Sequence, residues 1–184
     1  MSQFEFFAVA VSIILALGIS RLLDGILPSL QASRRYWVHF LWVIQKLFNH
    51  LIWWWGTWAA NTAFEWNLAW FIWFVAGPIV LYLQVTALVP RTQENIISWE
   101  QHFYEIRRWF FLGNLAICGI LILGRIATPI DLLPSVTVGL VALASIALVG
   151  MATDNRRVHW VLVIAALSIQ LLGLGTAMFS AGSY

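Results

Sequence analysis

Six long apolar stretches, separated by short polar connections, constrain this chain more than any other feature of its sequence. Each is close to or above the roughly 18 to 20 residues that cross about 30 Å of hydrocarbon as a helix. Helices satisfy the backbone N–H and C=O groups where no water is present. The sequence therefore predicts an all-α fold, a polytopic membrane protein built as a six-transmembrane-helix bundle in a single domain. The stretches cover residues 4–27, 37–60, 66–89, 109–126, 132–150 and 158–180.

The composition of the 184 residues excludes several other classes of protein. The chain is 61% hydrophobic and only 10% charged, so it lacks the polar surface that a soluble domain of this size needs. Its apolar runs are continuous, whereas the strands of a transmembrane barrel alternate. A net charge of +2 is too small and too localised to indicate nucleic-acid binding, and the single cysteine, Cys118, excludes an intrachain disulfide.

The N-terminus has the features of a helix start rather than of a cleaved leader. It has no basic segment ahead of the first apolar run, and that run is longer than the core of a signal peptide. We therefore expect the run to be retained as the first span. Ser2 and Glu5 have the spacing of a capping box, in which each side chain binds a backbone amide at the helix start.

The distribution of the ten basic residues predicts the orientation of the bundle. Seven lie in the first, third and fifth connections, one (Arg125) lies on the opposite side, and Arg21 and Lys46 fall within apolar stretches. The arginine-rich side of a membrane protein faces the cytoplasm. We therefore expect both termini outside, in a bacterial inner membrane. The seven residues are Arg34, Arg35, Arg91, Arg107, Arg108, Arg156 and Arg157.

The longest connection, 90–108, contains an amphipathic pattern. Its apolar residues recur at steps of three and four, which is typical of a helix with one apolar face. We expect an interfacial helix over about 93–107 that lies on the membrane surface before the fourth span. A gate or a docking site for a cytoplasmic partner is the alternative. The apolar residues are Ile96, Trp99, Phe103, Ile106 and Phe110.

Lys46 is the only lysine, and it lies near the middle of the second stretch. A charge at that depth is costly unless it is paired, hydrated or extended toward the headgroups. Arg21 and Asp24 are three residues apart and are expected to pair on one face of the first helix. These residues predict a polar cavity that is open to the cytoplasm and suited to an anionic group; the alternative is that Arg21 and Lys46 reach the inner headgroups. The full predicted ligand-binding set is Arg21, Asp24, Lys46, Asn49, His50, Gln84 and Asn114.

Small residues recur at steps of three and four in the first and sixth stretches. Such stripes let two helix backbones approach closely in lipid. The pattern leaves open whether the stripes pack within one chain or between copies. They comprise Ala8, Ser12, Ala16 and Ser20, and Ala166, Gln170, Gly173 and Ala177.

The twelve tryptophans suggest a second kind of surface. Trp66, Trp70 and Trp73 fall at steps of four and three, so they share one face of the third helix. Lipid contact or packing explains such a face. The alternative is a flat wall for an apolar ligand, such as a quinone or a carotenoid pigment, or for a partner protein.

The sequence indicates neither a known cofactor nor an enzyme. His39 and His50 share a helix face, but His102 and His159 could serve only His39 as partners and His50 has none, which disfavours haem. Retinal on Lys46 is disfavoured because opsin-like proteins have seven helices with that lysine in the last. No metalloprotease, nucleophile-elbow or phosphate-loop motif is present, so catalysis by Lys46, His50 or Asp24 is a minor alternative.

Two functional hypotheses follow from these patterns. The first is a small channel- or transporter-like protein, homo-oligomeric, whose inner cavity binds an anionic group. The second is a non-catalytic accessory subunit of a larger membrane complex, or a protein that binds lipid, pigment or quinone through its second and third helices. Both hypotheses have membrane lipid as a partner and neither involves nucleic acid.

Overall fold

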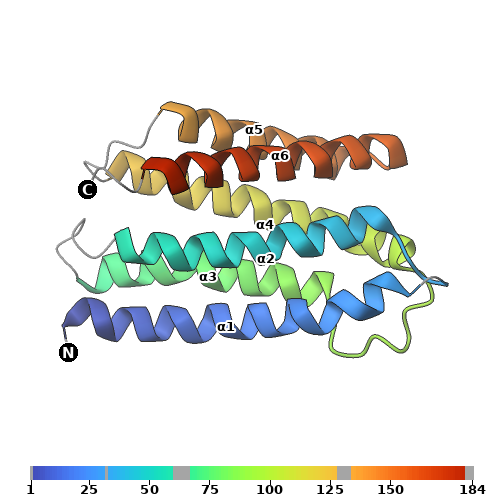
Figure 1. Ribbon diagram of the computed structural model, residues 1–184, viewed down its shortest axis with the longest axis horizontal. Helices are drawn as coiled ribbons and strands as arrows, with labels where there is room; N and C mark the ends of the chain where they lie inside the picture. The colour runs from blue at the N-terminus through green and yellow to red at the C-terminus, as the bar shows by residue number, and fades with distance from the viewer. Residues whose placement is uncertain (1, 32, 60–66, 128–133, 181–184) are drawn as a thin grey trace.

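The computed structural model describes residues 2–31, 33–59, 67–127 and 134–180 (Figure 1). Within these residues all regular structure is helical, with six helices and no strand, which confirms the predicted all-α class. The helices run side by side along the long axis, with α1 packed on α2 and α3, and with α4, α5 and α6 following beyond them. They are α1 (Gln3–Leu30), α2 (Trp37–Ala59), α3 (Leu68–Leu88), α4 (Trp99–Ala127), α5 (Pro134–Ala152) and α6 (Arg156–Ser180).

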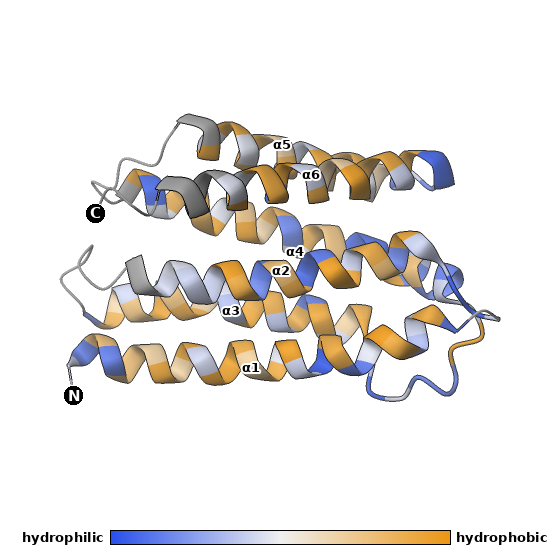
Figure 2. Ribbon diagram, in the orientation of Figure 1, coloured by the Kyte–Doolittle hydropathy of each residue, from blue (hydrophilic) through white to orange (hydrophobic). Residues whose placement is uncertain are grey.

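Four of the helices, α1, α3, α4 and α6, are long and apolar enough to cross a membrane. Apolar residues cover most of their length, and polar residues gather at the end where α2 and α4 begin (Figure 2). Four such helices indicate an integral membrane protein. α2 has 23 residues but carries several polar side chains, and α5 has an apolar run of only Val136–Ala152. The prediction of six spans is therefore not confirmed by helix length and hydropathy.

The start of α1 has the predicted capping box. The Glu5 backbone N–H donates to Ser2 Oγ at 3.2 Å, and the Ser2 backbone N–H donates to Glu5 Oε2 at 2.7 Å. Asn67 caps α3 in a simpler way, because its Oδ1 accepts the Trp70 backbone N–H at 3.1 Å. These bonds satisfy amides that have no partner inside the helix.

The expectation of a separate interfacial helix over 93–107 was wrong. Residues 90–98 form turns and bends, and α4 then runs without a break from Trp99 to Ala127. The apolar face was correctly identified, but it packs inside the protein, since Trp99, Phe103 and Phe110 are fully buried. Nothing in this segment interrupts the helix, because it contains no proline.

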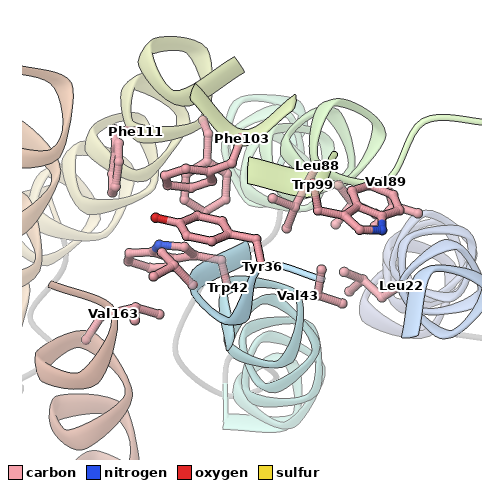
Figure 3. Packing of buried hydrophobic residues seen from close by; sticks show 14 of the residues in the cluster. Leu22, Tyr36, Trp42, Val43, Leu88, Val89, Trp99, Phe103, Phe111 and Val163 are labelled. Carbon is pink, nitrogen blue, oxygen red and sulfur yellow. The ribbon is translucent and has the colours of Figure 1, made fainter. Parts of the chain in front are cut away.

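A cluster of aromatic side chains fills the core at the end of the bundle where α2 and α4 begin (Figure 3). Trp42 of α2 makes edge contacts with Phe110 and Phe111 of α4, with ring centroids 5.1 and 5.4 Å apart. Beside them the Tyr36 hydroxyl lies 3.3 Å from that of Tyr104. Burial, and then the hydrogen bond with Tyr104, raises the pKa of Tyr36, so its hydroxyl stays protonated.

The two predicted small-residue stripes are only partly at helix contacts. In α1, Ala8 and Ser12 are half-buried, whereas Ala16 and Ser20 are exposed. Packing of these two exposed residues against another copy of the chain remains a prediction. In α6, Ala166 and Gln170 are buried and Gly173 is exposed, and the side chain of Ala177 lies outside the described residues.

A close approach of α1 to α2 occurs on a different face of α1, at Gly18. A Cβ atom added at Gly18 would lie 2.3 Å from Nε2 of His50, which is fully buried in α2. The face of α1 that packs on the other helices consists of Val11, Leu15, Gly18, Leu22, Gly25 and Ser29. Glycine at this position therefore sets the spacing of the two helices.

Gly18→Ala should destabilise the protein by about 1 to 3 kcal/mol, because the added methyl group must displace a buried imidazole. Thermal unfolding in detergent would show this as a lower Tm. Gly119→Ala is the matched control, since no atom lies within 4 Å of a Cβ built there. Equal melting temperatures for the two variants would contradict the close contact between Gly18 and His50.

Candidate functional site

Lys46 lies at the centre of a hydrogen-bonded group that joins α2, α3 and α4. Its side chain is fully buried, and Nζ donates to Gln84 Oε1 at 3.1 Å and to Asn114 Oδ1. The ring of Phe110 lies 5.2 Å from Nζ on a further side. Two acceptor oxygens and an aromatic face are the surroundings that suit an ammonium group.

Gln84 completes this group from α3. Its Nε2 donates to the Phe110 backbone oxygen at 2.8 Å and to Asn114 Oδ1 at 3.0 Å. The contact depends on Gly113, because a Cβ there would lie 2.4 Å from Gln84 Cγ. A glycine next to Asn114 thus lets α4 approach close enough for both hydrogen bonds.

A second polar group lies one turn along α2 and reaches α6. The Asn49 Oδ1 atom accepts a hydrogen bond from Gln170 Nε2 and a long one, at 3.4 Å, from Gln45 Nε2. His50 is turned toward α1, and its Nδ1 donates to the Lys46 backbone oxygen at 2.8 Å. Gln170, predicted only as a packing residue, therefore also binds a member of the predicted ligand-binding set.

A cavity of about 410 Å³ lies beside these groups, between α2, α3, α4 and α5. Its polar lining is confined to Gln45, Asn49, Asn114 and Cys118, and the remaining lining residues are apolar. Farther along the helices the lining continues through residues that are apolar and exposed. These outer residues, called the rim below, are Ile52, Gly56, Leu121 and Val136.

The cavity includes residues that the sequence analysis did not select. Trp42 and Trp53 of α2 contribute to its wall. Trp42 is buried, and its indole Nε1 has no hydrogen-bond partner in the part of the chain that the structure describes. The sequence contained a pattern that could have identified these residues, because the cavity-lining residues of α2 fall at helical steps of three and four along one face. They are Trp42, Gln45, Asn49, Ile52, Trp53 and Gly56.

Arg21 lies away from this cavity, at the C-terminal end of α3. Its Nε donates to the Val89 backbone oxygen at 2.8 Å. The two preceding carbonyls are bound by histidines, Leu88 by His39 Nε2 at 2.9 Å and Ala87 by His102 Nε2 at 3.0 Å. Side chains from α1, α2 and α4 therefore bind the carbonyls that a helix end leaves without partners, where positive charge is also favoured.

The predicted ligand-binding set is thus divided between several places. Lys46, Gln84 and Asn114 form one hydrogen-bonded group, and Asn49 lies at the cavity beside them. His50 faces α1. Arg21 binds the end of α3, and Asp24 is exposed on α1, so the expected pairing of these two is not what the structure shows.

The predicted tryptophan surface of α3 does not contribute to the cavity. Trp70 and Trp73 are half-buried, and the Trp73 indole lies beside Gly124 of α4. Trp66 lies outside the described residues. The hypothesis that this tryptophan surface binds an apolar ligand or a partner therefore stays a prediction, and it concerns a face of α3 that does not line the cavity.

Across residues 2–31, 33–59, 67–127 and 134–180, no group of three or more His, Cys, Asp or Glu side chains is placed to hold a metal ion. Comparisons with protein-family models, with curated proteins and with solved structures found no match to this chain.

Arg21→Met should cost about 1 to 3 kcal/mol of stability, because the buried Val89 carbonyl would lose a charged donor. Chemical or thermal unfolding in detergent would measure the loss. Arg91→Met is the control, because Arg91 is exposed just beyond α3. If Arg21→Met unfolds at the same temperature as the parent and the control, the bond to Val89 does not contribute to stability.

Proposed function

We propose that this chain is a membrane-embedded binding protein for a single-chain amphipathic molecule of the lipid class. The observation that carries the proposal is the shape and lining of the cavity of about 410 Å³. Its inner end offers side-chain amides, and its wall and rim are apolar. A volume in the range of about 300 to 1,000 Å³ is typical of small-molecule sites.

The rim supports entry from the hydrocarbon of the membrane rather than from water. Ile52, Leu121 and Val136 are exposed apolar side chains, and Gly56 has no side chain to obstruct the opening. From Lys46 to Gly56 the helix rises about 15 Å, at roughly 1.5 Å per residue. A molecule with a polar end among the amides would thus extend one apolar chain toward the rim.

The geometry supports this second hypothesis from the sequence more than a channel or transporter. The transport hypothesis relied on Arg21 and Asp24 to attract and orient an anion together with Lys46. Arg21 is instead bound to Val89, Asp24 is exposed, and Lys46 is bound to Gln84 and Asn114. No polar path from an aqueous face to the cavity is needed for a ligand that arrives through lipid.

Closing the rim should abolish binding of a neutral amphiphile. Gly56→Phe places a ring at the rim, where no atom of the described residues lies within 4 Å of a built Cβ. We expect radiolabelled dodecanol to bind the parent protein in phosphatidylcholine nanodiscs at about one molecule per chain, above the level in empty nanodiscs. The Gly56→Phe variant should lose about tenfold or more in affinity.

Gly119→Phe is the control for this experiment, since Gly119 has the same free space around its Cβ but does not line the cavity. It should bind dodecanol as the parent does. No binding to the parent above empty nanodiscs, or equal binding by Gly56→Phe and the parent, would refute the proposed function.

We also propose that all six helices span the membrane, with both ends of the chain outside. α2 carries its polar side chains Gln45, Lys46 and His50 inside the bundle, so its low mean hydropathy does not prevent it from spanning. α2 and α5 lie alongside the four long apolar helices (Figure 1). The arginine-rich end of the bundle would face the cytoplasm of a bacterial cell.

Labelling of single cysteines tests this orientation. In a Cys118→Ser background, Gln3→Cys should react with an impermeant maleimide in intact cells, and Ser33→Cys should react only after the cells are opened. Both positions are exposed in the structure, so access within the protein does not limit the reaction. The opposite labelling pattern would reverse the proposed orientation.

A further inference from the structure

Lys46 is a buried cationic side chain without an acidic partner among the described residues. Ion pairs in the described part of the chain join Arg107 to Asp154 and Arg156 to Glu100, and neither includes Lys46. The partners of Nζ are two neutral amide oxygens and the face of Phe110. An ionisable residue inside a membrane protein is expensive and usually marks a binding or transport site.

The charge of Lys46 is connected to the cavity through Asn114. Lys46 Nζ donates to Asn114 Oδ1, which also accepts from Gln84 Nε2 at 3.0 Å. These two donors fix the orientation of the Asn114 amide, so its Nδ2 lies on the other side of the group. Asn114 itself lines the cavity. A ligand there would meet an amide donor that is polarised by the amine behind it.

Trp42 lies at the same inner end. Trp42 lines the cavity, and its buried Nε1–H has no partner among residues 2–31, 33–59, 67–127 and 134–180. Indole Nε1 is a donor only, so it requires an acceptor. The inner end of the cavity therefore lies beside a positive charge that has no anion among the described residues.

Resting on the proposed function, we infer that the ligand is a carboxylate-headed single-chain lipid, with the chemistry of a free fatty acid. The carboxylate accepts from Asn114 Nδ2 and provides the negative charge that Lys46 lacks. The apolar wall holds the acyl chain, which leaves past the rim at Gly56. A carboxylate has only acceptor atoms, which matches the amide donor of Asn114.

A matched set of probes separates the headgroup from the chain. Dodecanoate, methyl dodecanoate and dodecanol have the same chain length and differ in charge and head. Each would be radiolabelled and bound to the protein in phosphatidylcholine nanodiscs, with empty nanodiscs subtracted. We expect dodecanoate to bind about tenfold or more tightly than the two neutral probes, because only the carboxylate compensates the charge of Lys46.

Lys46→Met should remove this preference, so that within the variant dodecanoate binds no more tightly than dodecanol, a loss of about tenfold in selectivity. Arg91→Met is the control, because it removes one positive charge outside the cavity and should leave all three affinities unchanged. Should Lys46→Met fail to fold, the comparison of dodecanoate with its methyl ester on the parent protein decides the question by itself.

The outcomes distinguish the two proposals. Binding of none of the probes refutes the proposed function and the inference together. Equal binding of dodecanoate, ester and alcohol keeps the proposed function and overturns the carboxylate assignment. A preference for dodecanoate that survives in a folded Lys46→Met protein overturns the role of Lys46.

Discussion

The need to satisfy one buried amine determines how the middle of this bundle is built. The Lys46 side chain of α2 is buried between helices, and it donates hydrogen bonds to Gln84 on α3 and to Asn114 on α4. Inside a membrane protein such a group is costly unless every donor has a partner. This requirement explains the glycine at position 113, because α4 lies so close to Gln84 that a side chain would not fit there. The neighbouring amides Gln45 and Asn49 then border the cavity rather than lipid.

The aromatic core and the cavity occupy different parts of the interior. At the end where α2 and α4 begin, Trp42, Phe110 and Phe111 pack edge to face and fill the space between helices. Toward the other end of α2 the neighbouring helices α4 and α5 contribute smaller side chains, such as Cys118 and Val136, and a void remains. Trp42 belongs to both regions, so the aromatic core forms the closed end of the cavity. A ligand in the cavity is therefore stopped by the aromatic core at the inner end, whereas its other end can extend past the rim.

The helices were predictable because their apolar stretches are long and continuous, and the capping box of Ser2 and Glu5 was readable from its spacing. The sequence also placed Lys46, Gln84 and Asn114 in one set, because polar residues deep in apolar helices must find one another.

The sequence misplaced Arg21, because a bond to the end of α3 depends on where that helix terminates in space. It assigned Trp99 and Phe103 to a surface helix, because an apolar helix face reads the same against lipid as against protein. The cavity was missed since a void depends on the packing of several helices, although Trp42, Gln45 and Asn49 follow one face of α2.

The hydrogen bonds at the C-terminal end of α3 come from helices on both sides of it in the chain, so they cannot all form at the same stage of synthesis. The carbonyls of Leu88 and Val89 are bound by His39 and Arg21, which precede α3 in the chain, whereas the carbonyl of Ala87 is bound by His102, which follows it. As the chain leaves the ribosome, α3 thus meets two of its three capping donors at once and lacks the third until α4 has been made. A chain truncated after α3 would leave the Ala87 carbonyl without its donor and would also leave Lys46 without Asn114, so both groups are satisfied only when α4 packs in place.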